Sequence, residues 1–183
     1  MILGLDISTS STGWCVLDRN TNAVIDIGFI PLNKEKNLFT KAAIVMNKLT
    51  SIVEDNKITS VAVEQNLQSF RSGFSSAHTL STLSKFNGIV SYITFILTEI
   101  EPEDINVSTA RKNAGIKVQR EKICGISTKE QVLAWAMNEV KTHDWPTKVV
   151  TRGKLKGQTV QIKECYDMAD AYVIAKAAAI MNI

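Results

Sequence analysis

Four acidic residues have types and spacings that suit metal chemistry. Two of them, Asp167 and Asp170, lie three residues apart at the start of the final apolar run, ECYDMADAYVIAKAAAIMNI. On a helix, residues at positions i and i+3 share one face, so the two carboxylates repel each other unless a cation lies between them. Asp6 and Glu64 each end an apolar run, ILGLD and SVAVE. A carboxylate at the end of a buried strand is costly without a partner, and a divalent cation is a suitable one.

Each acid also has a simpler interpretation when it is considered alone. Asp6 could begin a turn and cap the segment STSS, and Glu64 could begin a loop and face solvent. Asp167 could be an acid that the helix dipole favours at a helix N-terminus. Asp170 is harder to explain in this way, because Ala, Tyr and Val follow it inside the helix.

Convergence of the four acids would create a metal site. If the last helix packs over the ends of the first and fourth strands, the four carboxylates come together. Mg²⁺ prefers oxygen ligands and keeps several waters, which leaves positions for phosphate oxygens. Two such ions about 3.5–4 Å apart can activate a water and stabilise the leaving oxygen of an in-line phosphoryl displacement.

The hydrophobic pattern predicts the elements that must position these acids. Short apolar runs between polar turns indicate strands, and apolar residues at spacings of three and four indicate helices. The expected order is ILGLDI, WCVLD and AVIDIGFI as strands, a helix at 37–55, strand ITSVAVEQ, a helix at 75–98, strand INVST, helix STKEQVLAWAMNEV, a hairpin at 148–163, and a closing helix from about Tyr166. This order predicts an α/β protein with a mixed five-stranded sheet flanked by helices, in one domain over residues 1–183. The first and fourth strands can be neighbours in it.

Composition limits the classes of protein that remain. The 183 residues are 45% hydrophobic and 21% charged, which indicates a folded chain, and the net charge of +3 permits a polyanionic partner without requiring one. Three scattered cysteines without a CxxC pair argue against zinc and favour reduced thiols in a cytoplasm-like compartment. The N-terminal segment MILGLDISTS lacks the basic region of a signal peptide. We find no continuous apolar stretch of 18 residues, so the sequence predicts no membrane span.

Taken together, the acid motifs resemble those of the RuvC family of Holliday junction resolvases, within the RNase H-like superfamily. The segments ILGLDISTSSTGW, VAVEQ and DMADAYVIAKA match the family's D-x-[GS]-x-x-x-x-G motif, strand-ending Glu and D-x-x-D-A motif, in that order. The resemblance covers essentially the whole chain. It implies an RNase H-like fold and a homodimeric endonuclease that nicks symmetric strands of four-way DNA junctions in the cytoplasm of a bacterium or phage-infected host. It implies that two Mg²⁺ ions, replaceable by Mn²⁺, are bound by the catalytic residues Asp6, Glu64, Asp167 and Asp170.

The sequence departs from the family pattern in three places. Family members usually have Pro-Gly after the first Asp, where this chain has Ile7 and Ser8, as in phage and other divergent members. Where the family carries an aromatic wedge for the junction centre, this chain has Leu67, with Phe70 three residues on. Phe70 could instead pack beneath its loop. The hairpin KVVTRGKLKGQTVQIK has no counterpart in the bacterial enzymes.

Basic residues are placed where a DNA backbone could meet them. The resemblance implies that a lysine near the scissile phosphate comes from the segment STARKNAGIKVQREK. Lys112 and Lys117 both fit this role, and Arg111 lies in the same segment. Lys129 matches a second family lysine. The hairpin segment 145–163 has no acid and five cations, which are Lys148, Arg152, Lys154, Lys156 and Lys163. This bias favours contact with the sugar-phosphate backbone, and the alternative is a solvated basic face.

The helix expected at 75–98 is apolar over more than one face, and Gly88 in it would allow close approach of another backbone. The resemblance implies that this helix forms the dimer interface, and two-fold symmetry suits a four-way junction. The alternative is that the helix lies at the centre of a single core.

Other functions fit parts of the sequence. DISTSSTGW also resembles the phosphate loop of sugar kinases and actin-like ATPases, but those proteins need two facing domains and leave the D-x-x-D-A helix unexplained. A junction-binding protein without cleavage activity would gain nothing from an acidic cluster. A flap or broader branched-DNA endonuclease, or an RNase H-type nuclease, remains open, and paired symmetric nicks would favour the resolvase.

Overall fold

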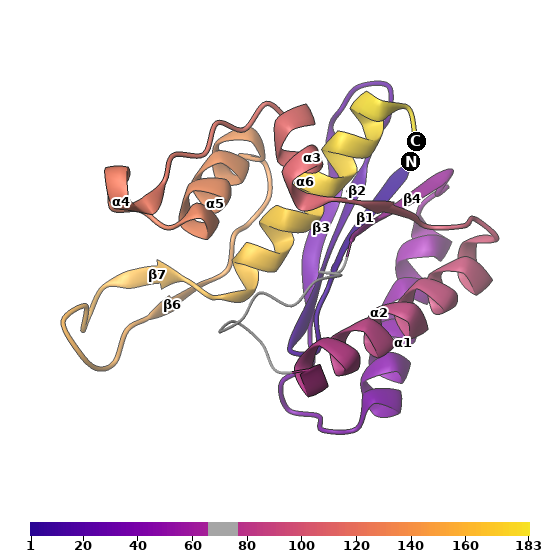
Figure 1. Cartoon of the computed structure of the whole chain (residues 1–183), viewed down its shortest axis with the longest axis horizontal. Coiled ribbons are helices and arrows are strands. Elements are labelled where there is room, and N and C mark those ends of the chain that lie inside the picture. The colour runs from indigo at the N-terminus through magenta and orange to yellow at the C-terminus, as the bar shows by residue number, and fades with distance from the viewer. Residues whose placement is uncertain (66–76) are drawn as a thin grey trace.

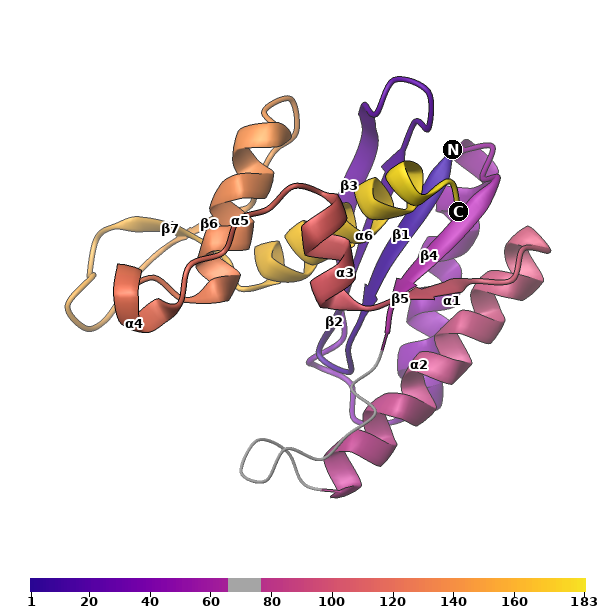
Figure 2. The same ribbon diagram turned by 45° about the horizontal axis from the view of Figure 1, so that its top comes forward.

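The computed structural model describes residues 1–65 and 77–183. A five-stranded sheet with helices on both faces forms its centre (Figures 1 and 2). The strands of this sheet are β1 Ile2–Ile7, β2 Ser11–Leu17, β3 Val24–Pro31, β4 Ser60–Glu64 and β5 Glu103–Ile105. The helices are α1 Leu38–Asp55, α2 Ala77–Thr98, α3 Val107–Asn113, α4 Glu121–Cys124, α5 Thr128–Glu139 and α6 Glu164–Met181. A separate two-stranded sheet consists of β6 Thr147–Val149 and β7 Thr159–Gln161.

The strand order across the main sheet is β3-β2-β1-β4-β5. β1 pairs antiparallel with β2 and parallel with β4, while β2 pairs antiparallel with β3 and β4 parallel with β5. The predicted mixed sheet is therefore confirmed, and so is the neighbouring position of its first and fourth strands. Because β1 and β4 run in the same direction, their carboxyl ends meet at one edge of the sheet.

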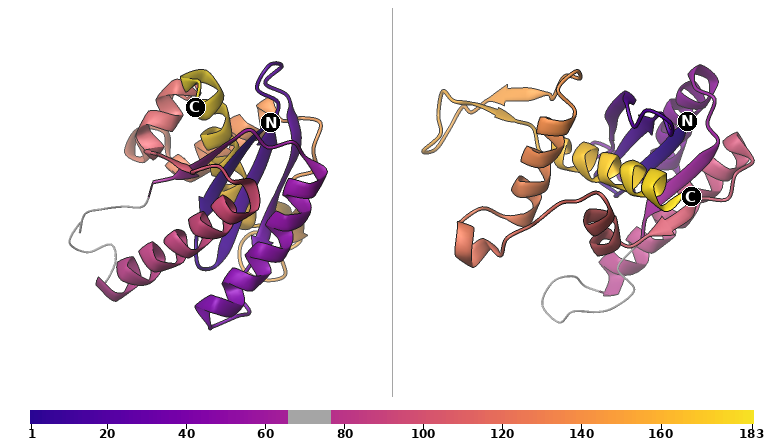
Figure 3. Two further views of the ribbon diagram at one scale, coloured as in Figure 1. Left: turned by 90° about the vertical axis from the view of Figure 1, so that its right-hand side faces the viewer. Right: turned by 90° about the horizontal axis from the view of Figure 1, so that it is seen from above.

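Alternation along β1 decides which face Asp6 reaches. Leu3, Leu5 and Ile7 belong to a core that the sheet forms with α1 and α2. Successive side chains of a strand point to opposite faces, so Asp6 points to the other face. In Figure 3, α6 lies across that face, opposite α1 and α2.

The same alternation places Glu64. Val61 and Val63 pack with α1 and α2, whereas Ala62 belongs to the core that contains α6. Glu64 follows Ala62 at a spacing of two and therefore points toward α6 as well.

α6 approaches the sheet more closely than a side chain would allow at two positions. A Cβ atom on Gly13 would lie 2.0 Å from the backbone oxygen of Asp167, and one on Gly4 would lie 2.5 Å from that of Ala171. Only glycine fits at these crossings. The close approach brings the first turns of α6, with Asp167 and Asp170, over β1 and β2.

The fifth strand is present in the sheet, but its predicted extent is wrong. INVST is predicted as a strand, but β5 ends at Ile105 and residues 107–113 form α3. The cause is Asn106, whose side-chain oxygen accepts a hydrogen bond from the Ser108 backbone N–H (2.9 Å). Asparagine favours such N-cap positions because it satisfies an otherwise unpaired helix donor.

Other boundaries differ less. β2 begins at Ser11, three residues before the predicted strand WCVLD, and the short helix α4 is not anticipated by the pattern. The hairpin before the last helix is confirmed as β6 and β7, which pair antiparallel. The predicted helix STKEQVLAWAMNEV is confirmed as α5, and it begins with a capping box: the Ser127 hydroxyl accepts from the Glu130 backbone N–H, and the Glu130 carboxylate accepts from the Ser127 backbone N–H.

α2 is apolar beyond the face that it buries. In the described part of the chain, it is the one helix long and apolar enough to cross a membrane by length and composition, although polar residues such as Lys85 and Asn87 interrupt it. Core helices of soluble proteins pass the same test, but only 22% of this apolar window is buried. Tyr92, Phe95 and Ile96 are 64%, 42% and 57% exposed. Much of the apolar surface of α2 thus faces outward from the described chain.

Candidate active site

Three carboxylates meet at the edge of the sheet where β1 and β4 end. Asp6, Glu64 and Asp170 each offer one oxygen, and these oxygens lie within 4.8 Å of one another. Asp6 does not cap the following turn, because the Ser8 hydroxyl does so by accepting from the Ser11 backbone N–H (3.2 Å). The fold therefore joins side chains from two strands and a helix that are far apart in sequence. We call these three residues the acid cluster.

Asp167, the fourth predicted ligand, lies one turn before Asp170 on α6. It is not among the three residues whose oxygens lie within 4.8 Å of one another. Desolvation raises the pKa of Asp167 to about 6, against the opposing effects of Ser11 and Lys129. Its charge in turn contributes to the raised pKa of Asp6, after the larger effects of desolvation and the other two acids. Asp167 therefore lies beside the acid cluster and is not counted as a member of it.

Burial and mutual repulsion make the charged form of the acid cluster unfavourable. Desolvation, followed by the charges of Glu64 and Asp170, raises the pKa of Asp6 well above 3.8. Desolvation and then Asp170 raise the pKa of Glu64 from 4.5 to about 7. Desolvation also raises the pKa of Asp170, which is 8% exposed. Such a group of carboxylates is stable as anions only when a cation neutralises it.

Among the described residues, two cations act on the acid cluster. Arg111 in α3 lies with one Nη 3.4 Å from Asp170 Oδ1, and it counteracts the effect of desolvation on the pKa of Glu64 and Asp170. Lys129, in the first turn of α5, counteracts it at all three members. The Nε of Arg111 is buried and has no hydrogen-bond acceptor among the described residues. The guanidinium is therefore only partly satisfied by Asp170.

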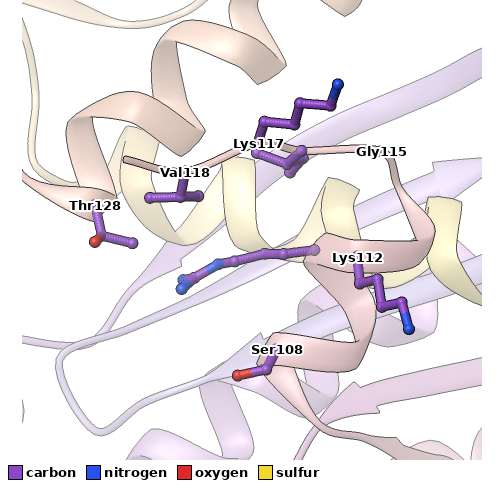
Figure 4. Close-up of a pocket in the computed structure, with 8 residues that line it drawn as sticks. Ser108, Lys112, Gly115, Lys117, Val118 and Thr128 are labelled. Atoms are coloured by element: carbon purple, nitrogen blue, oxygen red, sulfur yellow. The ribbon is translucent and has the colours of Figure 1, made fainter. Parts of the chain in front are cut away.

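A cavity of about 560 Å³ opens next to Arg111, between α3 and the start of α5 (Figure 4). Its lining consists of Ser108, Arg111, Lys112, Gly115, Ile116, Lys117, Val118 and Thr128. In Figure 4, Lys112 and Lys117 extend to different sides of the cavity. Three cations and two hydroxyl groups along one lining suit an anion such as a phosphate.

The remaining predicted DNA-binding residues lie elsewhere. Leu67 and Phe70 fall outside the described residues. Between β6 and β7 lie three exposed cations, which are Arg152, Lys154 and Lys156. The hairpin that carries them lies beyond the N-terminal end of α6 (Figure 1).

The acid cluster fits a divalent cation. Three carboxylate oxygens within 4.8 Å of one another form the hard oxygen donor set that Mg²⁺ and Mn²⁺ accept. Asp6 and Glu64 are only partly buried, which leaves access for water or a phosphate oxygen. A bound cation would also offset the repulsion that helps to raise the pKa of Asp6 and Glu64.

Comparison with solved structures covers the whole chain. Thermus thermophilus RuvC in complex with a Holliday junction substrate has a TM-score of 0.66 and 12% identity over 99% of this chain and 93% of that chain. The chain has the fold of RuvC. A further structure of Thermus thermophilus RuvC gives a TM-score of 0.60 at 12% identity, over 99% of this chain and 94% of that one. The yeast mitochondrial Holliday junction resolvase gives 0.52 at 16% identity, over 98% and 77%. No family model and no curated protein matches the sequence.

These likenesses confirm the predicted RNase H-like fold. What the sequence did not reveal is the position of Arg111, which the basic pattern marks only as a DNA-binding candidate. A signal was present, because Asn106 is a good N-cap residue directly before VSTARKN. Assigning a helix there would have placed Arg111 on an ordered element rather than in a loop.

The metal-free protein is expected to become less stable as pH rises from about 4.5 to 7. The Glu64 carboxyl keeps its proton up to about pH 7 in the folded state but releases it near pH 4.5 when unfolded. The folded state therefore binds more protons in this window, so the contribution is full below pH 4.5 and is lost as pH passes 7. We expect a loss of about 3 kcal/mol, measured by urea unfolding in EDTA at pH 5 and pH 8.

Glu64→Gln should reduce this dependence, because the amide does not titrate, while the raised pKa values of Asp6, Asp167 and Asp170 preserve a part of it. Glu54→Gln, at an exposed position of α1, is the matched control and should leave it unchanged. Mg²⁺ or Mn²⁺ should restore stability at pH 8 in the wild type. Equal unfolding free energies of the metal-free wild type at the two pH values would contradict this account.

Proposed function

We propose that this chain is a Mg²⁺-dependent, structure-selective DNA endonuclease that resolves four-way junctions, with residues 1–183 as one nuclease domain. The observation that carries the proposal is the convergence of Asp6, Glu64 and Asp170 from two strands, β1 and β4, and the helix α6. Its support from outside the chain is the fold shared with a RuvC that is bound to a Holliday junction substrate.

The acid cluster, with Asp167 beside it, would hold two Mg²⁺ ions, and Mn²⁺ could replace them. Once bound, the ions would activate a water for attack on the phosphodiester and stabilise the leaving 3′-oxygen. The rigid ends of β1, β4 and α6 fix the carboxylates before DNA arrives, so little reorganisation is needed at the moment of reaction.

The basic residues around the acid cluster would position the scissile strand. Arg111 and Lys129 lie where they would neutralise the phosphate oxygens that face the carboxylates. Lys112 and Lys117, on the cavity lining, would bind the adjoining backbone. Phosphate contacts of this kind set the register of DNA without reading its sequence.

A homodimer through α2 is part of the proposal. The exposed Tyr92, Phe95 and Ile96 share one face of α2, and exposed aromatic and apolar side chains of this type are typical of protein interfaces. Two-fold symmetry would present two acid clusters to two symmetric strands of one junction.

The kinase-like alternative has less support. In a phosphate loop, the hydroxyl and backbone groups of DISTSSTGW would have to be offered to a nucleotide. Here the Ser8 hydroxyl donates to the Ser11 carbonyl (2.7 Å), and Lys41 donates to the Thr9 carbonyl. These groups of the turn are thus bonded to other groups of the protein rather than offered to a nucleotide.

A supercoiled plasmid with an extruded inverted repeat tests the proposal. The wild type with Mg²⁺ should convert it directly to linear product, because a dimer cuts both symmetric strands within one complex. Nicked circles as the end product, with efficient cutting of flaps, would favour a broader branched-DNA enzyme. Cutting of RNA–DNA hybrids alone would favour an RNase H-type activity. No cleavage of any of these in Mg²⁺ or Mn²⁺ would overturn the nuclease assignment.

A further inference from the structure

The hairpin β6–β7 is a separate arm of the molecule. Its two strands pair with each other and not with the five-stranded sheet. Figures 1 and 3 show it extending away from the sheet beyond the start of α6. All residues from 151 to 159 are exposed. A surface of this kind contributes little to the core, so packing of the core does not explain its sequence.

The arm carries charge of one sign. Residues 145–163 include five cations and no acid. The ion pairs found among the described residues involve Arg111 and Lys176, and none involves a cation of the arm. Unopposed cations repel one another, and an ordinary solvated surface mixes both signs. The composition is therefore complementary to a polyanion.

The tip of the arm is ordered by its own backbone. The N–H of Val150 donates to the Gln158 carbonyl (2.9 Å), and the N–H of Gly157 donates to the Val150 carbonyl (2.8 Å). Gly153 and Gly157 adopt φ of +81° and +86°, a conformation that glycine accepts without strain. The turn can thus present its cations in a fixed arrangement.

The base of the arm is tied to the active site. Trp145 and Ile162, at the two ends of the hairpin, pack against the core that contains α6. The Ile162 N–H donates to the Pro146 carbonyl (3.0 Å) and closes the base. α6 begins at Glu164, so the arm runs directly into the helix that carries Asp167 and Asp170. Its cations therefore keep a fixed direction from the acid cluster.

We propose that the β6–β7 arm binds the phosphate backbone of a duplex DNA arm at a distance from the cleaved bond. The inference rests on the proposed function and adds a second DNA contact to it. From Thr147 to Gly153 the chain advances by six residues, which at about 3.3 Å each in extended backbone reach roughly 20 Å. At 3.4 Å per base pair this equals about six base pairs. Arg152, Lys154 and Lys156 at the tip would bind phosphates there, independently of base sequence.

The test compares two double variants that remove equal charge. Lys154→Gln with Lys156→Gln alters the tip. Lys57→Gln with Lys141→Gln is the control, because Lys57 precedes β4 and Lys141 follows α5, both at the ends away from the acid cluster. All four lysines are exposed, so neither variant should disturb folding. Affinity for a four-way junction with long arms is measured in Ca²⁺ between 50 and 200 mM salt, with hydroxyl-radical footprinting alongside.

Loss of two phosphate contacts should reduce the magnitude of the negative slope of log affinity against log salt by about 1.8. Over this salt range, wild-type affinity should therefore fall about 12-fold more than that of the tip variant. The wild type should also protect about six base pairs that the tip variant exposes, and the control should match the wild type. Equal slopes and footprints for the wild type and tip variant, with junction cleavage intact, would overturn the arm proposal alone. A wild type that binds no branched DNA would overturn it together with the proposed function.

Discussion

Asp6→Asn is expected to reduce junction cleavage by at least about a thousand-fold while leaving junction binding almost unchanged. Asparagine preserves the shape of the side chain at the end of β1, so the sheet register is maintained. It removes one of the three anionic oxygens that lie within 4.8 Å of one another. An amide oxygen is a weaker ligand for a hard cation than a carboxylate, so metal binding should weaken with activity.

The same substitution should stabilise the metal-free protein above pH 7. Asp6 is repelled by Glu64, Asp170 and Asp167, in addition to the cost of its desolvation, and a neutral amide relieves both effects. A catalytic loss caused by unfolding would instead lower stability, so a comparison of stability and metal affinity separates the two explanations. Thermal unfolding in EDTA and calorimetric titration with Mn²⁺ provide it. Asp55→Asn, at the exposed end of α1, is the matched control. An Asp6→Asn protein that cleaves like the wild type would refute the metal role of Asp6.

Local sequence patterns were sufficient for the strands that carry the site. Leu3 and Leu5 alternate with Gly4 and Asp6, so the position of Asp6 on the face opposite the first helix follows from the period of a strand. The predicted order of strands and helices then allowed the first and fourth strands to be neighbours, which brings Asp6 and Glu64 together. Both steps depend on short-range regularities that the chain itself displays.

The pairing of Arg111 with Asp170 could not be read in this way. The pairing depends on the contact between α3 and α6, two helices that are far apart in sequence. It also depends on the capped helix that begins after Asn106, where the sequence predicts the continuation of a strand. The separation of Asp167 from the other three acids is likewise a tertiary result, because i and i+3 spacing fixes only a shared helix face. How far each side chain reaches is set by where α6 crosses the sheet.

That crossing makes Gly13→Ala the substitution with the largest expected effect on stability. A Cβ atom there would lie 2.0 Å from the Asp167 backbone oxygen and 2.3 Å from its carbonyl carbon. A flexible side chain could move away from such a contact, but a helix backbone cannot do so without moving α6. We expect a loss of about 3 kcal/mol or more in unfolding free energy, since overpacking a well-packed contact usually costs about 1–3 kcal/mol.

The effect should reach the active site even where the variant still folds. If α6 moves off β2, Asp167 and Asp170 move with it, whereas Asp6 and Glu64 remain on the sheet. Mn²⁺ affinity should therefore fall in the folded fraction. Gly88→Ala is the matched control, because a Cβ atom there meets nothing within 4 Å, and in the middle of a helix it should stabilise by about 0.5–1 kcal/mol. Urea unfolding and Mn²⁺ titration of both variants give the measurement. A Gly13→Ala protein with wild-type stability and Mn²⁺ affinity would show that α6 does not depend on this contact for its position.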